Sequence, residues 1–161
     1  MKKIVFTLLA VLALSSCSKD NDESDITPIN GQYVGHTEYV DEYNNYSSTF
    51  CLTIENGLCT DFVIYSGAER FNYYRPADIS TKGSYPKYTY RINDFTVQAR
   101  FTGLENFTAN LSGALCTHKE TNNGLTGEVY GAIALEATDV HFKLDNTPLD
   151  ANGDGLLDSK Q

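Results

Sequence analysis

Oxygen-bearing side chains near the C-terminus form the motif best suited to chemistry. They surround Gly155 in the pattern D-x-N-x-D-G-x-x-D. Calcium prefers hard oxygen ligands, and this spacing brings carboxylate and amide oxygens around a sharp turn that glycine permits. The spacing therefore predicts a calcium site. Its predicted ligands are Asp150, Asn152, Asp154, the carbonyl oxygen of Leu156, and Asp158.

The same stretch resembles the start of an EF-hand-type or thrombospondin-type calcium loop, with one departure. The twelfth position, where such loops carry a bidentate glutamate, is Gln161, which offers a weaker oxygen. The resemblance implies weak binding, in the submillimolar to millimolar range of extracellular modules. The alternative is that residues 145–161 form an acidic tail that only keeps the protein soluble.

A second group of residues combines tyrosines with cations between residues 66 and 90. Tyrosine rings can stack on ligands, while their hydroxyls and the nearby cations add hydrogen bonds and charge. This mixture predicts a site for a small molecule or a glycan fragment. Tyrosine is also common in ordinary strands, which is the competing interpretation. The predicted ligand-binding residues are Tyr73, Tyr74, Arg75, Tyr88 and Tyr90.

Motifs for catalysis are absent from the sequence. His36, His118 and His141 are isolated, and no G-x-S-x-G, H-E-x-x-H or glycine-rich phosphate loop occurs. The acidic residues form no pair whose spacing indicates acid and base roles. We therefore expect a protein that is not an enzyme and has no catalytic residues, with calcium as the one candidate cofactor.

The first 16 residues have the layout of a signal peptide, with two lysines, an apolar run from Ile4 to Leu14, and two serines. Leu14-Ser15-Ser16-Cys17 resembles the bacterial lipobox, which implies that Cys17 carries the lipid. Residues 17–23 also resemble the export tag of Bacteroidetes lipoproteins, which implies an outer-membrane lipoprotein at the cell surface. The alternative is an ordinary secreted protein with a coincidental cysteine.

Composition narrows the possible partners. The net charge is −9, and loss of Lys2 and Lys3 with the signal peptide makes it more negative. This balance argues against nucleic acid and anionic lipid headgroups, because both require positive surface. It leaves cations, neutral ligands and a protein partner open. Three cysteines remain after Cys17, namely Cys51, Cys59 and Cys116, so at most one pair can form a disulfide.

Alternating apolar and polar residues predict an all-β domain over residues 31–144, after a lipidated, disordered tether at 17–30. About eight strands with short links favour an antiparallel up-and-down barrel, with a sandwich as the alternative. Asn93-Asp94 predicts a two-residue hairpin that pairs Ile92 with Phe95. For the turn at Asn56-Gly57 we favour a three-residue loop that pairs Ile54 with Leu58. That register places Cys51 and Cys59 together on the outer face, as exposed or partly exposed free thiols, with a Cys51–Cys59 disulfide as the alternative.

Gly31-Gln32-Tyr33-Val34-Gly35 resembles the opening of calycin and lipocalin-like barrels, and Thr138-Asp139 weakly resembles a second lipocalin signature. Three features depart from the family: Tyr33 replaces its tryptophan, no tryptophan occurs anywhere, and no helix pattern follows the strands. The resemblance implies non-catalytic binding of a small molecule or glycan fragment inside the barrel. The alternative is a structural or protein-interaction lipoprotein of the outer membrane whose barrel is filled.

Overall fold

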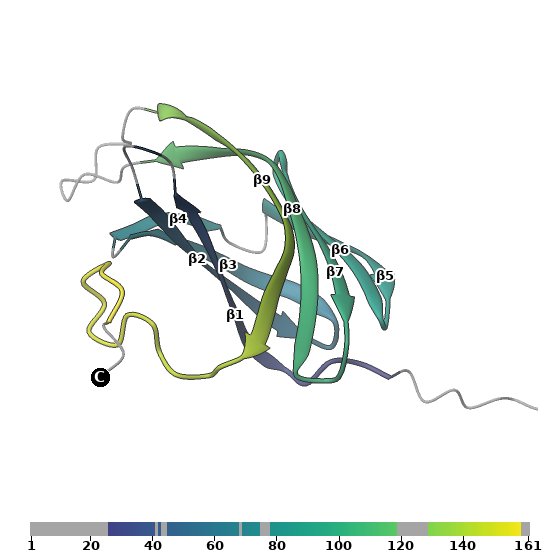
Figure 1. The fold of residues 1–161 in the computed structure, drawn as a ribbon. Helices are drawn as coiled ribbons and strands as arrows, with labels where there is room; N and C mark the ends of the chain where they lie inside the picture. The colour runs from purple at the N-terminus through teal and green to yellow at the C-terminus, as the bar shows by residue number, and fades with distance from the viewer. Residues whose placement is uncertain are drawn as a thin grey trace, which may run out of the picture.

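The computed structural model describes residues 26–40, 42, 45–67, 69–74, 78–118 and 129–158, and for some strand residues it describes only the backbone. These residues form nine β-strands (Figure 1). None of the described residues belongs to a helix that could span a membrane. The strands are β1 (Gly31–Val40), β2 (Asn45–Glu55), β3 (Leu58–Ser66), β4 (Glu69–Tyr74), β5 (Ile79–Ser84), β6 (Lys87–Ile92), β7 (Phe95–Phe101), β8 (Asn106–His118) and β9 (Val129–Leu144).

The strands form one antiparallel sheet in the order β4-β3-β2-β1-β9-β8-β7-β6-β5. Apart from β4 and β5, which are the two edges, neighbours in the chain are neighbours in the sheet, and β1 also pairs with β9. The sheet curls into a barrel (Figure 1). The two edge strands, β4 and β5, both lie beside β3, at different points along its length. β4 pairs with Phe62–Ser66 of β3, while the Thr81 hydroxyl of β5 accepts a hydrogen bond from the Cys59 amide at 3.1 Å. The nearly closed, all-β barrel confirms the predicted fold class.

The inside of the barrel is an aromatic core. Residues alternate strictly along β6 and β7, with every second side chain buried. The rings pack closely, since the centroids of Phe107 and Phe142 lie 4.6 Å apart and those of Phe101 and Phe107 lie 4.8 Å apart. Contacts of this kind add about 0.5–1.5 kcal/mol each beyond the burial of apolar area. The largest fully buried side chains are Tyr33, Tyr90, Phe50, Phe62, Phe95, Phe107 and Phe142.

Tyr33 closes the end of the barrel at which the described chain begins. Its hydroxyl lies 2.7 Å from the carbonyl oxygen of Ile29 and 2.8 Å from that of Leu104, and it donates to them. The Ile29 amide in turn donates to the Leu104 carbonyl at 3.0 Å. Burial, with a smaller effect of the Glu105 charge, raises the pKa of Tyr33 to about 12. Tyr33 therefore ties the segment before β1 to the loop between β7 and β8.

The turn between β2 and β3 differs from the predicted register. Asn56 and Gly57 form a two-residue turn with φ values of 51° and 80°, so Glu55 pairs with Leu58 and Ile54 pairs with Cys59. A β-bulge follows at once, because Thr53 pairs with Asp61 and leaves Thr60 as the extra residue of β3. The three-residue loop was wrong because a two-residue turn followed by a bulge brings the apolar residues back into phase.

The other predicted hairpin is confirmed, since Ile92 pairs with Phe95 and Tyr90 with Val97. The last strand, β9, is long and contains a bulge. Its bulge lies at Thr138-Asp139, opposite Asn110, where Asp139 has a φ of 55° and its amide donates to Asn110 Oδ1 at 3.2 Å. The bulge lets both halves of β9 keep their apolar side chains toward the core.

Candidate functional site

The predicted tyrosine site falls partly inside the barrel core. Tyr90 is fully buried and Tyr88 is 7% exposed, and their rings stack with centroids 5.7 Å apart. Tyr73 and Tyr74 lie on β4, opposite Val63 and Phe62, where the structure describes their backbone only. Arg75 lies outside the described residues. The described part of this group therefore consists of core residues and forms no open pocket.

The hydroxyl of Tyr90 is a polar group in this apolar interior. It is buried and has no hydrogen-bond partner among the described residues. Burial, together with the nearby Cys59, raises the pKa of Tyr90 above its ordinary value, so the ring stays neutral. An unpaired buried hydroxyl costs about 1–3 kcal/mol of stability. Here that cost stands against the burial of a large ring.

The segment after β9, residues 145–158, crosses the outside of the barrel as a strap (Figure 1). It begins at β1, where the Asp145 amide donates to the Gln32 carbonyl at 2.7 Å and the Gln32 amide donates to Asn146 Oδ1 at 2.9 Å. Leu149 is 7% exposed and anchors a second core outside the barrel. This outer core comprises Val34, Cys51, Tyr65 and Leu149, with Val63 and Leu157 partly buried against it.

The predicted calcium ligands form a tight loop in this strap. Asp150 accepts a hydrogen bond from the Gly155 amide at 2.9 Å, and Asn152 accepts one from the Asp154 amide at 3.0 Å. Asp154 accepts from the Leu156 amide at 2.8 Å, while Asp158 accepts from the Ala151 amide at 2.8 Å. Successive side-chain oxygens thus hold the backbone in one turn, and the five predicted residues come together.

Two observations bear on the metal capacity of this loop. Oδ1 of Asp150 is buried and has no hydrogen-bond partner among the described residues. The part of the chain that the structure describes contains no cluster of three or more His, Cys, Asp or Glu side chains arranged to hold a metal ion. One oxygen of each of Asp150, Asn152, Asp154 and Asp158 accepts a hydrogen bond from a backbone amide.

The two described thiols correct the prediction of exposed cysteines. Cys51 is 2% and Cys59 is 6% exposed, and both are free. Cys59 belongs to the barrel core and Cys51 to the outer core, so they lie on opposite faces of the sheet. Burial raises the pKa of each thiol to about 12. The bulge at Thr60 explains this difference, because it turns Cys59 inward. The side chain of Cys116 is not described.

The isolated histidines stay apart from any catalytic group in the described structure. His36 is exposed on β1, where its Nδ1 lies 2.9 Å from the Thr49 hydroxyl. His141 is exposed on β9. His36, His141 and Lys143 line one groove on the surface. The side chain of His118 is not described.

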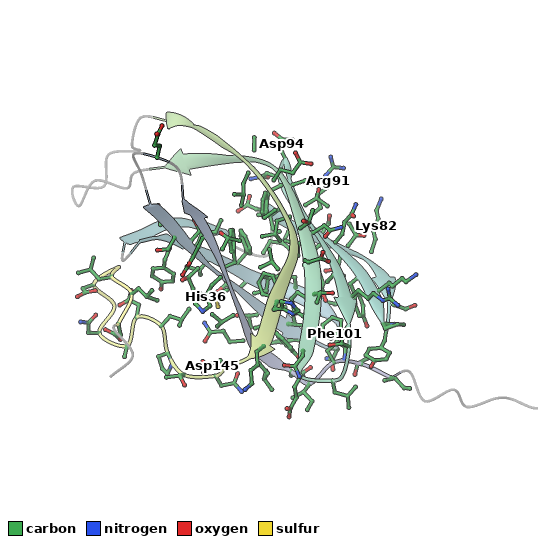
Figure 2. The ribbon with its side chains drawn as sticks, viewed as in Figure 1. His36, Lys82, Arg91, Asp94, Phe101 and Asp145 are labelled. Carbon is green, nitrogen blue, oxygen red and sulfur yellow. The ribbon has the colours of Figure 1, made fainter. Side chains whose placement is uncertain are left out.

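Sequence reasoning missed a surface on the outside of the barrel, over β5 to β9. Exposed cations lie on β5, β6, β7 and β9, and Figure 2 shows Lys82 and Arg91 pointing away from the sheet there. The alternation within each strand already assigns these cations to the outer face. The signal was therefore readable, but only if the outward positions of successive strands were compared.

A family model described as "Prokaryotic membrane lipoprotein lipid attachment site" matches residues 1–18, a range that includes Cys17. The match supports a membrane-anchored bacterial lipoprotein. No curated protein and no solved structure matches the chain. Export of the Bacteroidetes type, the outer membrane, exposure at the cell surface and the calycin resemblance stay predictions.

Proposed function

We propose that this chain is a lipid-anchored, non-catalytic envelope protein whose barrel is a solid interaction module, with Cys17 as the lipidated residue. The observation that carries the proposal is the packed interior. Large aromatic side chains fill the space where a barrel of this size would hold a ligand. Tyr88 and Tyr90, the described members of the predicted ligand site, belong to that packing. Partners are therefore expected on the outside of the barrel.

Native mass spectrometry of the lipidated full chain in neutral detergent tests this proposal. A filled barrel predicts a protein mass that carries the lipid and no stoichiometric small molecule. A small molecule that copurifies with the protein, and is lost in the variants Tyr73→Ala and Tyr74→Ala, would support the interior ligand site instead. A mass without lipid on Cys17 would contradict the anchor.

We propose, as a second function, that the loop at residues 150–158 binds calcium. The unpartnered, buried Oδ1 of Asp150 favours this function, because an oxygen removed from water is stabilised by a cation. Asn152, Asp154, the Leu156 carbonyl and Asp158 would complete the ligand set. The hydrogen bonds to backbone amides would hold these oxygens in place before the ion arrives.

Calcium titration followed by isothermal calorimetry tests the second function. We expect one site of submillimolar to millimolar affinity. Asp154→Asn should weaken the site, whereas Asp139→Asn removes the same charge from the bulge in β9 and should leave it unchanged. Calcium binding at this loop would be contradicted if Asp154→Asn and Asp139→Asn gave equal heats of calcium binding, or if the parent chain gave no saturable heat.

A further inference from the structure

The outer face of β5 to β9 forms a surface that we call the cationic wall. It consists of the outward-facing residues of β5–β8 together with His141 and Lys143 of β9. It borders the exposed carboxylates Glu136, opposite Ser112, and Asp139 of β9. Every lysine and arginine whose side chain the structure describes lies on it, and all are exposed. This concentration stands out in a chain with 21 acidic and 12 basic residues. The five cations are Lys82, Lys87, Arg91, Arg100 and Lys143.

The pairing of the strands brings like charges together on this wall. Lys87 of β6 lies directly opposite Arg100 of β7, and the next residue across, Thr108, lies opposite His141. Like charges in directly opposed positions destabilise a sheet. No outward position of β5–β8 carries a carboxylate that would offset them. The wall therefore keeps an unfavourable arrangement that an anionic partner would relieve.

The neutral side chains of the wall are small and polar. Serine, threonine, glutamine and asparagine occupy the outward positions between the cations, at Ser80, Ser84, Thr89, Thr96, Gln98, Asn106, Thr108, Asn110 and Ser112. These groups can donate and accept hydrogen bonds with the hydroxyls of a sugar chain. No outward position of β5–β8 is aromatic, and stacking platforms are what single-stranded nucleic acids use.

The shape of the wall suits a polymer better than a small ligand. Neighbouring strands lie about 4.8 Å apart, so five strands span about 19 Å of outer surface. The wall carries its charges on the outer side of the barrel, and the loop at residues 150–158 lies away from Lys82 and Arg91 (Figure 2). Asp145, where the strap begins, lines a groove together with His141 and Lys143. Charges more than about 8 Å away are largely screened at physiological salt. The overall negative charge therefore does not cancel the local attraction.

We propose that the cationic wall binds an acidic polysaccharide, held by its carboxylate groups and its hydroxyls. This inference rests on the proposed function, since it names the partner class of the solid interaction module. The probe is alginate, a polymer of uronic acids, with neutral dextran and single-stranded oligo-dT as comparisons. Binding to the lipidated full chain in neutral detergent is measured by calorimetry at low and at physiological salt.

We expect alginate to bind more tightly than dextran and oligo-dT, and to weaken as salt rises. The double variant Lys87→Gln/Arg100→Gln should lose about tenfold in affinity, because each exposed charge contact contributes up to about 1 kcal/mol. The control Ser47→Glu/Thr27→Glu makes the same change in net charge at exposed positions off the wall and should stay within about twofold of the parent chain.

Three outcomes would overturn the inference: no binding of alginate, equal loss in the wall variant and the control, or oligo-dT binding as tightly as alginate. Circular dichroism of each variant shows whether the barrel is intact. A small molecule found inside the barrel would contradict the proposed function and leave the alginate result standing. If alginate does not bind and no small molecule is found inside the barrel, only the proposed binding by the cationic wall is contradicted.

Discussion

Truncation of Leu149 to alanine should release the strap and leave the barrel folded. Leu149 is 7% exposed and packs against Val34, Cys51 and Tyr65 on the outside of the sheet. Leucine-to-alanine changes in cores cost about 2–5 kcal/mol. The lower value applies to a surface strap, because the strap can collapse partly onto the gap. A cost of about 2 kcal/mol corresponds to an about 30-fold larger population of the released form.

Cys51 reports on this release because it lies under the strap and its thiol is 2% exposed. The assay is the rate of maleimide labelling in a Cys116→Ser background, with the labelled site located by mass spectrometry. Leu149→Ala should raise the rate at Cys51 about 30-fold, in proportion to the open population. Cys59 lies in the barrel core and should keep its slow rate.

Leu156→Ala is the matched control, since it makes the same chemical change in the same strap at a side chain that is 47% exposed. Its labelling rate at Cys51 should equal that of the parent. An unchanged rate in Leu149→Ala, or an equal rise in both variants, would refute the strap as the cover of Cys51. An equal rise at Cys51 and Cys59 would show global unfolding and refute local release.

Two further predictions concern buried polar groups. Tyr33→Phe removes the hydroxyl that donates to two carbonyls and should lower the free energy of unfolding by about 1–2 kcal/mol. Tyr90→Phe removes an unpartnered hydroxyl and should leave that free energy equal or higher. Urea titration of both variants checks this, and an equal loss in the two would contradict it. The second concerns alkaline pH. Because burial raises the pKa of Cys51 and Cys59 from 9.0 to about 12, the unfolded chain binds fewer protons above pH 9. Below about pH 9 the titration of these thiols should therefore add no pH dependence to the free energy of unfolding. Between about pH 9 and pH 12 each thiol should lower that free energy by about 1.4 kcal/mol per pH unit. Cys51→Ala/Cys59→Ala should flatten that fall relative to its own neutral-pH stability, and an unchanged slope in urea titrations would count against buried neutral thiols.

The strands that bury one face were predictable, because their pattern of period two is strong. β5 was not predicted, because none of its residues is buried. The pairing register between neighbouring strands was harder to predict from the sequence. The pairing of Ile92 with Phe95 follows from the turn alone, but the pairing after Asn56-Gly57 depends on a bulge at Thr60. A bulge adds one residue without a sequence signal of its own here. Its effect, the inward turn of Cys59, is visible only once β2 and β3 are placed together.

The strap shows a different limit of sequence reasoning. The acidic pattern from Asp150 to Asp158 predicted a calcium site, which stays a prediction, and the structure folds these residues into one tight turn. The same composition suggested a solvated tail, because polar and glycine-rich stretches bury little apolar surface. Two leucines decide otherwise. Leu149 and Leu157 flank the loop and pack on the outer sheet, and the Asp158 amide closes it by donating to the Leu149 carbonyl at 2.7 Å.

Net charge averages over surfaces that are too far apart to influence one another. A value of −9 argued against nucleic acid and anionic lipid headgroups, and that stays a prediction, but the described cations gather over β5 to β9. Strand alternation separates inward from outward positions, and the meander places outward positions of successive strands side by side. Charge summed over one face of β5–β8 is therefore the quantity that bears on a partner, and there it is positive.

The lipid anchor limits the distance between the barrel and the membrane. The described chain enters at the closed end, where Ile29 and Tyr33 are tied to the loop at Leu104. With lipid on Cys17, the nine-residue step to Ile26 reaches at most about 30 Å. That reach limits how far the closed end can lie from the membrane. Lys87 and Arg100 occupy opposed positions on neighbouring strands, so a row that crosses the strands runs around the barrel, and a polymer lying along that row would contact both charges.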